Sequence, residues 1–144
     1  MQIMMRPTIA LAMGDPAGIS PELTARLLAL DDVAARARLV VIGDRRVLDD
    51  GARVATVRLD LKNVFPDADF SKQLDGAVFI DLGHLDPSSI APSTATAEGG
   101  QFALANYRHA LTLARDEAVC FMPFKYPGRH RRQQSQGADP AKTQ

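Results

Sequence analysis

The fold is decided by the stretch Pro7-Thr8-Ile9-Ala10-Leu11-Ala12-Met13-Gly14-Asp15-Pro16-Ala17-Gly18-Ile19-Ser20-Pro21-Glu22. Its first half is a short apolar run that Gly14 and Asp15 interrupt, which predicts a β-strand ending in a turn. Ser20 and Pro21 predict the start of a helix, because a serine hydroxyl can accept from a free backbone N–H and proline suits the first helical position. The stretch is therefore a strand–loop–helix unit.

The same reasoning, continued along the chain, gives alternating strands and helices. The helix after Ser20 should run to about Leu30, with Leu23, Leu27 and Leu30 on one face. The later elements are expected as follows: a strand at Arg38–Gly43, apolar enough to be buried on both faces, a short helix at Asp44–Asp50 ended by Gly51, a half-exposed strand at Val57–Leu61, a strand at Ala77–Leu82, a long connection at 83–97, a helix at Glu98–Arg115 with Leu104, Tyr107, Leu111 and Ala114 on one face, and a strand at Ala118–Met122.

Strands that alternate with helices imply an α/β fold with a mostly parallel sheet covered on both faces, here a partial three-layer α/β/α arrangement. We expect this organisation to occupy residues 1–124. The twenty residues 125–144 contain no Leu, Ile, Val, Met or Phe and carry five basic residues against one acidic. Such a segment lacks the apolar surface that offsets ordering entropy, so it is predicted to be a disordered basic tail.

The composition favours an ordinary globular protein of about one domain. The chain has 144 residues, a formal net charge of zero and 46% hydrophobic residues. Zero net charge argues against a dedicated nucleic-acid or membrane-surface protein, and no apolar run approaches the length of a membrane span. The single cysteine, Cys120, is expected to be buried, and the absence of a leader-like N-terminus favours a cytoplasmic location.

The best site candidate is the loop Gly14, Asp15, Pro16, Ala17 and Gly18. Ligands of open parallel sheets gather beyond the carboxyl ends of the strands, and the N-terminus of a helix favours anions. As a pattern the loop is neither G-x-G-x-x-G nor a phosphate-binding P-loop, and Asp15 would repel a bare phosphate. A simple Gly-Asp-Pro turn therefore remains open at this point.

The remaining chemical side chains predict no site. His84, His109 and His130 lack metal-ligand spacing, and His109 is expected to be solvated among polar helix neighbours. The basic cluster Arg129–Arg132 has no aromatic residues interleaved and is expected to be a solvated tail. The acidic pairs Asp31-Asp32 and Asp49-Asp50 are expected to be surface charge near helix ends.

As a ten-residue string, Met13–Glu22 resembles the opening signature of the 4-hydroxythreonine-4-phosphate dehydrogenase family. Supporting matches are Val41–Asp44, Glu98–Gly100 and Ala118–Phe121, each at the spacing the family shows. Ser20 and Pro123-Phe124 resemble a sister branch that acts on four-carbon sugar-acid phosphates such as threonate or erythronate 4-phosphate. The similarity covers about residues 6–124.

The resemblance implies an isocitrate/isopropylmalate-dehydrogenase-like fold and a homodimeric, NAD-dependent dehydrogenase of the pyridoxine-biosynthesis type that also needs a divalent metal (Zn, Mg or Co). Its substrate would be a 4-phosphorylated hydroxy acid that undergoes oxidative decarboxylation. The sequence departs from the family at Met122, at Lys125-Tyr126 and in the short connection Arg115–Glu117. The family's metal and NAD segments have no match here, so no catalytic or metal residue is carried over and no tight cofactor binding is expected. The leading hypothesis is a truncated or frame-shifted family member that lacks the catalytic half and is inactive.

Two other hypotheses come from different classes of protein. The chain could be a non-catalytic interaction protein, a half-domain that pairs with another copy or with an intact relative. It could also be a small anion- or nucleotide-binding module that uses the Gly14–Gly18 loop.

Overall fold

The sheet is built around strand β2, Arg38–Gly43, in which every residue after Arg38 is buried. The structure, a computed structural model, describes residues 6–68, 76–116 and 120–123. Within these ranges the elements are β1 (Thr8–Ala12), α1 (Ser20–Leu28), α2 (Asp31–Arg36), β2, α3 (Arg45–Ala55), β3 (Lys62–Val64), β4 (Val78–Asp81), the 3-10 turn η1 (Pro87–Ser89), α4 (Ala97–Asp116) and β5 (Cys120–Pro123).

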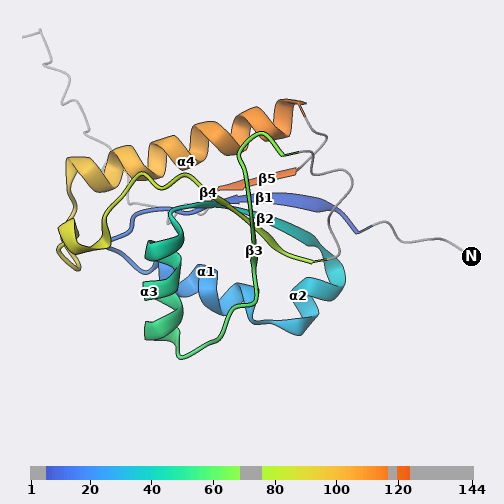
Figure 1. The fold of residues 1–144 in the computed structure, drawn as a ribbon, viewed down its shortest axis with the longest axis horizontal. Helices are drawn as coiled ribbons and strands as arrows, with labels where there is room; N and C mark the ends of the chain where they lie inside the picture. The colour runs from blue at the N-terminus through green and yellow to red at the C-terminus, as the bar shows by residue number, and fades with distance from the viewer. Residues whose placement is uncertain (1–5, 69–75, 117–119, 124–144) are drawn as a thin grey trace, which may run out of the picture.

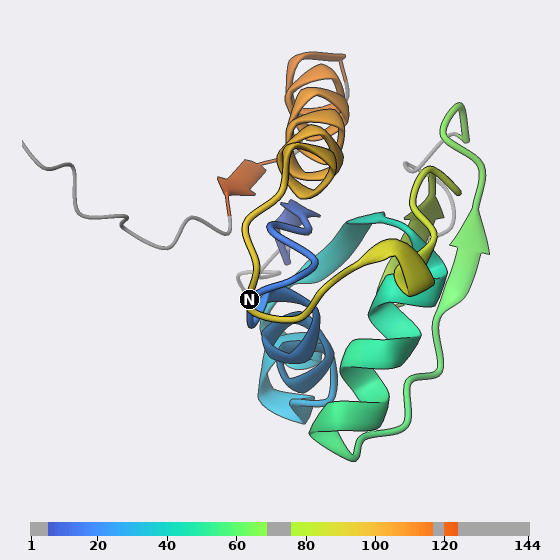
Figure 2. The same cartoon turned by 90° about the vertical axis from the view of Figure 1, so that its left-hand side faces the viewer.

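The five strands form one sheet in the order β3-β4-β2-β1-β5, and all four neighbouring pairs are parallel. Helices α1, α2 and α3 lie on one face of the sheet and α4 lies on the other (Figures 1 and 2). The three-layer α/β/α prediction is confirmed for the described residues. Because all strands run in the same direction, their carboxyl ends share one edge, where Ala12 pairs with Ile42 and Gly43 pairs with Asp81.

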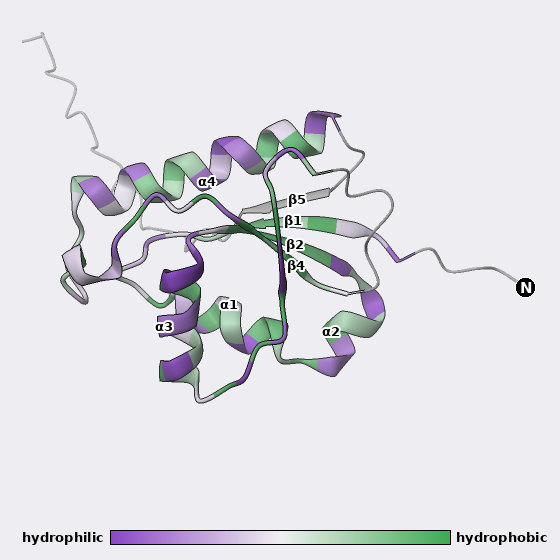
Figure 3. Ribbon diagram, in the orientation of Figure 1, coloured by the Kyte–Doolittle hydropathy of each residue, from purple (hydrophilic) through white to green (hydrophobic). Residues whose placement is uncertain are grey.

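Side chains of successive strand residues enter two separate cores. Leu11, Val41 and Phe79 point toward α1 and α3, whereas Ala10, Val40 and Ile80 belong to the cluster under α4. This alternation is the period of two that a pleated strand imposes, and burial on both faces is what a parallel sheet requires. Figure 3 shows apolar residues along the central strands and a mixture of polar and apolar residues along the helices.

Helix α3 extends beyond the predicted end. It was expected to stop at Gly51, but it continues to Ala55 and ends at Thr56, whose φ is 58°. Gly51 instead lies at the contact between α3 and α1. A Cβ at this position would meet the backbone carbon and oxygen of Pro21 at 2.4 Å. The glycine serves close approach of two helices rather than helix termination.

The apolar faces predicted for two helices are largely wrong, although Leu27 of α1 does pack against the core. In α1 the buried residues are Ser20, Pro21, Thr24 and Ala25, and the chain leaves the helix before Leu30, which precedes the unpredicted α2. In α4 the buried residues are Gly99, Phe102, Asn106, Ala110 and Leu113, whereas Leu104, Tyr107 and Leu111 are exposed. Most of these buried residues are small, which lets the helices lie close to their neighbours; the larger exceptions in α4 are Phe102, Asn106 and Leu113.

The prediction of a hydrogen-bonded strand at Val57–Leu61 is wrong. Val57, Leu59 and Leu61 do pack against the core in alternation with exposed neighbours, but pairing with β4 begins at Lys62.

The strands at β1, β2 and β4 and the long helix are confirmed to within a few residues. The predicted tail at 125–144 lies outside the described residues. None of the described helices has the length and hydropathy that a membrane span needs.

The Gly51 contact leads to a stability prediction. Gly51→Ala should lower the free energy of unfolding by about 1–3 kcal/mol, because the new methyl group forces α1 and α3 apart. Gly100→Ala is the matched control, since its Cβ would meet nothing within 4 Å, and a helical alanine in open space should stabilise by up to about 1 kcal/mol. Thermal unfolding followed by circular dichroism measures both, and a harmless Gly51→Ala would contradict the close contact.

Candidate functional site

The predicted loop Gly14–Gly18 lies at the carboxyl end of β1, directly before α1. Asp15 shapes it: its Oδ1 accepts a hydrogen bond from the Ala17 N–H at 2.9 Å, and its carbonyl accepts from the Gly18 N–H at 3.2 Å. This is the side-chain turn that aspartate favours before proline. The Asp15 side chain is nevertheless exposed, and no bond is found for its Oδ2 among the described residues. The residue can therefore hold the turn and still present a carboxylate oxygen to a ligand.

Two side chains fix the base of this loop. The Ser20 hydroxyl accepts from the Gly14 N–H at 2.8 Å, and the fully buried Asn106 donates from Nδ2 to the Met13 carbonyl at 3.0 Å. Ser20 was predicted to cap α1, but the helix has no side-chain cap and Ser20 is its first residue. The correction has a simple cause: the hydroxyl closes the loop onto itself instead of satisfying the helix end.

The N-terminus of α4 packs against the same loop. The Thr96 hydroxyl accepts from the Gly99 N–H at 3.0 Å, and a Cβ on Gly99 would lie 3.2 Å from the Asp15 Oδ1. Glycine at position 99 lets the positive end of the helix dipole approach the Asp15 carboxylate, which is a favourable arrangement.

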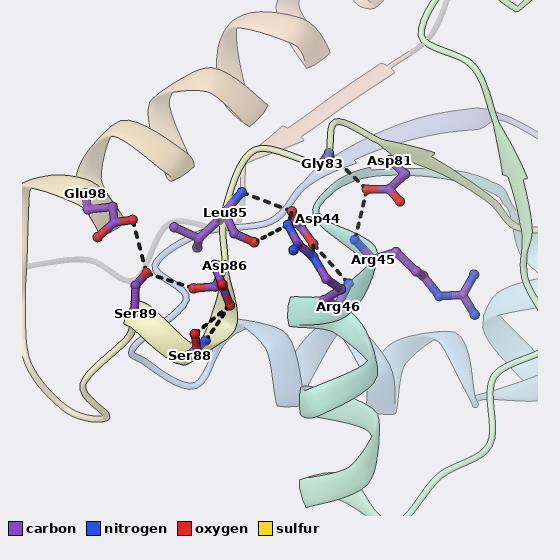
Figure 4. A network of polar contacts seen from close by, with 10 residues as sticks. All are labelled: Asp44, Arg45, Arg46, Asp81, Gly83, Leu85, Asp86, Ser88, Ser89 and Glu98. Carbon is purple, nitrogen blue, oxygen red and sulfur yellow. Dashed lines mark hydrogen bonds and ion pairs between the residues drawn. The ribbon is translucent and has the colours of Figure 1, made fainter.

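The long connection from residue 82 to 96 crosses the carboxyl edge of the sheet and is anchored by Asp44, which follows β2. The Asp44 carboxylate is fully buried and accepts from the backbone N–H groups of Leu85 and Arg46, both at 3.0 Å. The Arg46 guanidinium pairs with Asp44 at 2.9 Å and also donates to the Leu85 carbonyl at 2.7 Å. Figure 4 shows this group joining β2, α3 and the connection.

Further along, the connection bonds directly to the predicted loop. The Ser93 N–H donates to the Ala17 carbonyl at 2.9 Å. Ser93 has a φ of 61°, in the left-handed region that residues other than glycine seldom adopt. Asp81, which ends β4, accepts from the N–H groups of Arg45 and Gly83 at 3.1 and 3.0 Å and so fixes where the connection starts (Figure 4).

A cleft of about 260 Å³ results between the loop, α1, α3 and the connection. Its walls are formed by Pro16, Ala17, Gly18, Pro21, Glu22, Val47, Asp50, Gly51, Arg53, Val54, Pro87, Ile90 and Pro92. The lining is mostly apolar, with the charged side chains of Glu22, Asp50 and Arg53 among it. Of the five loop candidates, Pro16, Ala17 and Gly18 line this cleft, whereas Gly14 and Asp15 form the base and the turn beside it.

The surroundings of Asp44 shift the pKa of its carboxyl group. Burial alone raises the pKa of Asp44, but the hydrogen bonds from Arg46 and from the Leu85 and Arg46 backbone outweigh it and hold the pKa below its ordinary value. The carboxylate therefore stays ionised and paired. Its role is to hold the connection in place rather than to exchange a proton with a substrate.

The histidines do not converge. His84 stacks on the Phe102 ring, with centroids 4.7 Å apart. The expectation of a solvated His109 is wrong: the side chain is partly buried, which lowers its pKa, and its Nε2 has no partner among the described residues. His130 and the Cys120 side chain lie outside what the structure describes. Within the described ranges, no three His, Cys, Asp or Glu side chains are grouped so that they could hold a metal ion.

Sequence reasoning missed the residues that organise this region. Asp44 entered only as the start of a predicted helix and as part of a four-residue match, and none of Asp81, Arg46 and Asn106 was identified. A signal for the two aspartates was present, because each directly ends an apolar run, Leu39–Gly43 and Val78–Ile80. The carboxyl ends of neighbouring parallel strands share one edge, so polar residues there meet in space.

The fold and the site define a parallel α/β domain of the kind that binds ligands beyond its strand ends. Among known proteins, the chain is 55% identical over 133 residues to a Rhizobium meliloti (strain 1021) protein assigned as 4-hydroxythreonine-4-phosphate dehydrogenase 2, covering 85% of this chain and 38% of that protein. It is 34% identical over 127 residues to the D-threonate 4-phosphate dehydrogenase of Cupriavidus necator, covering 86% of this chain and 38% of the relative.

A crystal structure of a 4-hydroxythreonine-4-phosphate dehydrogenase from Burkholderia phymatum superposes with a TM-score of 0.73 at 26% identity, over 83% of this chain and 36% of that chain. No protein-family model matches the sequence. The chain thus corresponds in sequence and fold to the N-terminal part of the 4-hydroxythreonine-4-phosphate dehydrogenase family. It spans less than two fifths of the length of these relatives.

The buried ion pair between Asp44 and Arg46 predicts a pH-dependent contribution to the free energy of unfolding. Asp44→Asn should lower the free energy of unfolding at neutral pH by about 1–3 kcal/mol, because the charge-assisted bonds to Arg46 are lost. A carboxyl group whose pKa is lower in the folded than in the unfolded protein stabilises the fold at pH values above its unfolded pKa. That contribution disappears as the pH falls through the pKa of the folded protein. The difference between wild type and variant should therefore shrink below about pH 4.

Denaturant titrations at several pH values measure this difference. Asp31→Asn is the control, because Asp31 is exposed in the first turn of α2 and should change stability by less than about 0.5 kcal/mol. A difference between wild type and Asp44→Asn that stays constant from neutral to acid pH would contradict the prediction.

Proposed function

We propose that this chain contributes the N-terminal part of an NAD-dependent, divalent-metal-dependent dehydrogenase that oxidatively decarboxylates a 4-phosphorylated hydroxy acid. The observation that carries the proposal is 55% identity to a Rhizobium meliloti relative across 85% of this chain. The loop lies at the edge of the sheet where α/β enzymes bind ligands.

The substrate class follows from the names of the relatives. They are assigned to 4-hydroxythreonine 4-phosphate and to D-threonate 4-phosphate. The two molecules share a four-carbon acid with neighbouring hydroxyl or amino groups and a terminal phosphate. We propose this shared chemistry for the complete protein, together with a homo-oligomeric cytoplasmic enzyme, and we leave the group at C2 undecided between the two branches.

The proposed role of Gly14–Gly18 is to shape one wall of the active-site region. Pro16, Ala17 and Gly18 give the cleft an apolar wall, and the exposed carboxylate of Asp15 can orient a substrate hydroxyl. Because Asp15 Oδ1 is used within the turn and Gly99 brings the end of α4 close by, the carboxylate is held in a defined position. A fixed acceptor of this kind contributes by orientation rather than by proton transfer.

The described residues fit neither cofactor. Among the residues that the structure describes, no three His, Cys, Asp or Glu side chains are grouped so that they could hold a divalent metal. The Ala17 and Gly18 N–H groups, which could otherwise meet a dinucleotide phosphate, are bonded to Asp15. In this proposal Zn, Mg or Co and NAD are bound by parts of the family fold that the chain does not span, and no reaction step is assigned to them here.

The first test concerns the 144-residue chain itself. Purified chain should show no NAD reduction with threonate 4-phosphate or 4-hydroxythreonine 4-phosphate, with or without added Zn²⁺ or Mg²⁺, because the described residues offer no metal-binding group to polarise the substrate hydroxyl. Absorbance at the NADH band measures turnover. Activity that copurifies with the chain and disappears on adding a chelator would contradict the prediction.

The second test concerns Asp15 and uses a full-length relative that carries the Met13–Glu22 string. Asp15→Asn keeps an acceptor for the Ala17 N–H but removes the charge. If the carboxylate orients substrate, kcat/KM should fall at least about tenfold, or about 1.4 kcal/mol, while the melting temperature hardly changes. Steady-state kinetics and thermal unfolding on the same preparation separate the two effects.

Asp15→Ala serves as the comparison, because it removes both the charge and the turn acceptor. It should lower the melting temperature as well as kcat/KM. Near-normal kcat/KM in Asp15→Asn, combined with a destabilised Asp15→Ala, would mean that Asp15 only holds the turn, and the proposed role of the loop would be wrong.

A further inference from the structure

The peptide unit between Met13 and Gly14 is held at both of its polar groups by side chains from helices on opposite faces of the sheet. The Met13 carbonyl accepts from Nδ2 of Asn106 in α4 at 3.0 Å, and the Gly14 N–H donates to the Ser20 hydroxyl of α1 at 2.8 Å. Figure 2 shows these two helices on the two sides of the sheet. We call this arrangement the Met13–Gly14 clamp. It fixes the plane of the last peptide unit before Asp15.

The clamp lies where the regular strand pairing ends. Pairing of β1 with β2 runs to Ala12, and the Met13 N–H still donates to the Ile42 carbonyl at 3.0 Å. The Met13 side chain is buried against Gly43, where a Cβ would lie 2.5 Å from the Met13 Sδ. The next residue is Gly14, and a glycine backbone can adopt many conformations. The clamp removes that freedom directly before the exposed carboxylate of the loop.

Asn106 is an unfavourable residue for a core position. Its side chain is fully buried, and although Nδ2 is bonded, Oδ1 has no partner among the described residues. Burying an amide with an unsatisfied acceptor costs more free energy than burying an apolar side chain of similar volume. Other inward positions of α4, such as Phe102 and Ala110, are apolar. Packing of the helix therefore does not explain an amide here, whereas the bond to the Met13 carbonyl does.

Helix α4 contacts the loop at a second point. Gly99 lies seven residues before Asn106 on the same side of the helix, because seven residues make about two turns. A Cβ on Gly99 would lie 3.2 Å from the Asp15 Oδ1, so the start of α4 packs closely against that carboxylate. The helix thus contacts the loop both at the Met13 carbonyl and at the Asp15 side chain.

We propose that Asn106 is a positioning residue, which acts through the Met13 carbonyl to hold the Asp15 carboxylate where it meets the substrate. The inference rests on the proposed function of Asp15 and extends it to a residue of another helix. Because Asn106 is fully buried, it acts through the backbone and does not touch the substrate itself. Without its donor, the Met13–Gly14 peptide is held at one end only, by Ser20.

The first experiment uses the 144-residue chain and two variants at position 106. At neutral pH, Asn106→Asp places a carboxylate opposite the Met13 carbonyl, so two acceptors face each other, whereas the protonated carboxyl can donate again. Burial raises the pKa of such a carboxyl, so the donor returns as the pH falls below that raised pKa, before the acid range in which Asp44 is protonated. Asn106→Leu has a similar volume and carries no donor at any pH.

The readouts are the Gly14 and Ala17 amide signals in ¹H–¹⁵N spectra, which report the clamp and the Asp15 turn. In Asn106→Asp both signals should be displaced at neutral pH and should return to the wild-type positions at about pH 5. In Asn106→Leu they should be displaced at both pH values. Asp15 and His109 are titratable groups near position 106, so each variant is compared with the wild-type chain at the same pH.

Leu113→Ala is the control, because it leaves a cavity under the same helix in the cluster that contains Ala10 and Val40. It should lower the melting temperature and leave the Gly14 and Ala17 amide signals unchanged. Displacement of these signals in Leu113→Ala would mean that any loosening of α4 disturbs the loop, which would overturn the proposal.

The variants at position 106 decide the proposal in the following way. Wild-type amide signals in both variants overturn it, and so do signals in Asn106→Asp that fail to return on acidification, since the neutral carboxyl restores a donor. An Asn106→Asp chain that is unfolded at neutral pH and folds at about pH 5 supports it. The same variant unfolded at both pH values counts against it.

The second experiment uses a full-length relative that carries the Met13–Glu22 string and an asparagine aligned with Asn106. Asn106→Leu should lower kcat/KM at least about tenfold, as expected for Asp15→Asn. The double variant should be no less active than Asp15→Asn alone, because Asn106 acts only through Asp15. Losses that multiply in the double variant overturn the positioning role. Normal kcat/KM in Asp15→Asn would instead refute the proposed function of Asp15, while the amide signals still decide whether Asn106 positions the loop.

Discussion

The buried carboxylate of Asp44 is the constraint on which the carboxyl edge of this sheet depends. It is desolvated at the end of the central strand, and it is satisfied only by groups from two other segments, the start of α3 and Leu85 in the connection. A buried charge without those partners would cost much free energy, so β2, α3 and the connection must all be correctly placed for the fold to be stable. The connection then reaches Ser93, whose N–H bonds to Ala17 and so fixes the cleft wall. The ion pair between Asp44 and Arg46 thus helps to position a loop that lies far from it in the sequence.

The second constraint is the close approach of backbones where glycine replaces a side chain. Because Gly51 has no side chain, α3 packs directly against Pro21 of α1, and because Gly99 has none, the start of α4 packs closely against the Asp15 turn. Both contacts involve the Met13–Glu22 unit, one at its helix and one at its loop. The unit is therefore held from the two faces of the sheet, which explains how a loop with an exposed carboxylate keeps a defined shape.

Much of the fold could be predicted from the sequence, because buried parallel strands are continuous apolar runs. Arg38–Gly43 and Ala77–Leu82 were located by this property alone. The errors share one physical origin: local patterns do not say which neighbours a residue meets. Glycine is common at helix ends, but Gly51 lies where α3 contacts α1. Serine is a common helix cap, but the Ser20 hydroxyl accepts from the Gly14 N–H instead. The loop itself was found from its position and its resemblance to a family. The position of Asp44 after an apolar run was a usable signal, whereas Asn106 could be recognised only once distant segments were placed together.

The mistaken face of α4 is the most informative of these errors. A line of Leu104, Tyr107 and Leu111 predicts burial, since exposing such a line to water is unfavourable. The structure buries a different line and leaves this one at the surface. Asn106 is buried because its side chain donates to the Met13 carbonyl, and Gly99 is buried because it lies against the Asp15 turn. Contacts with the Met13–Glu22 unit, which the local apolar pattern of α4 does not contain, therefore help to decide which side of α4 faces inward.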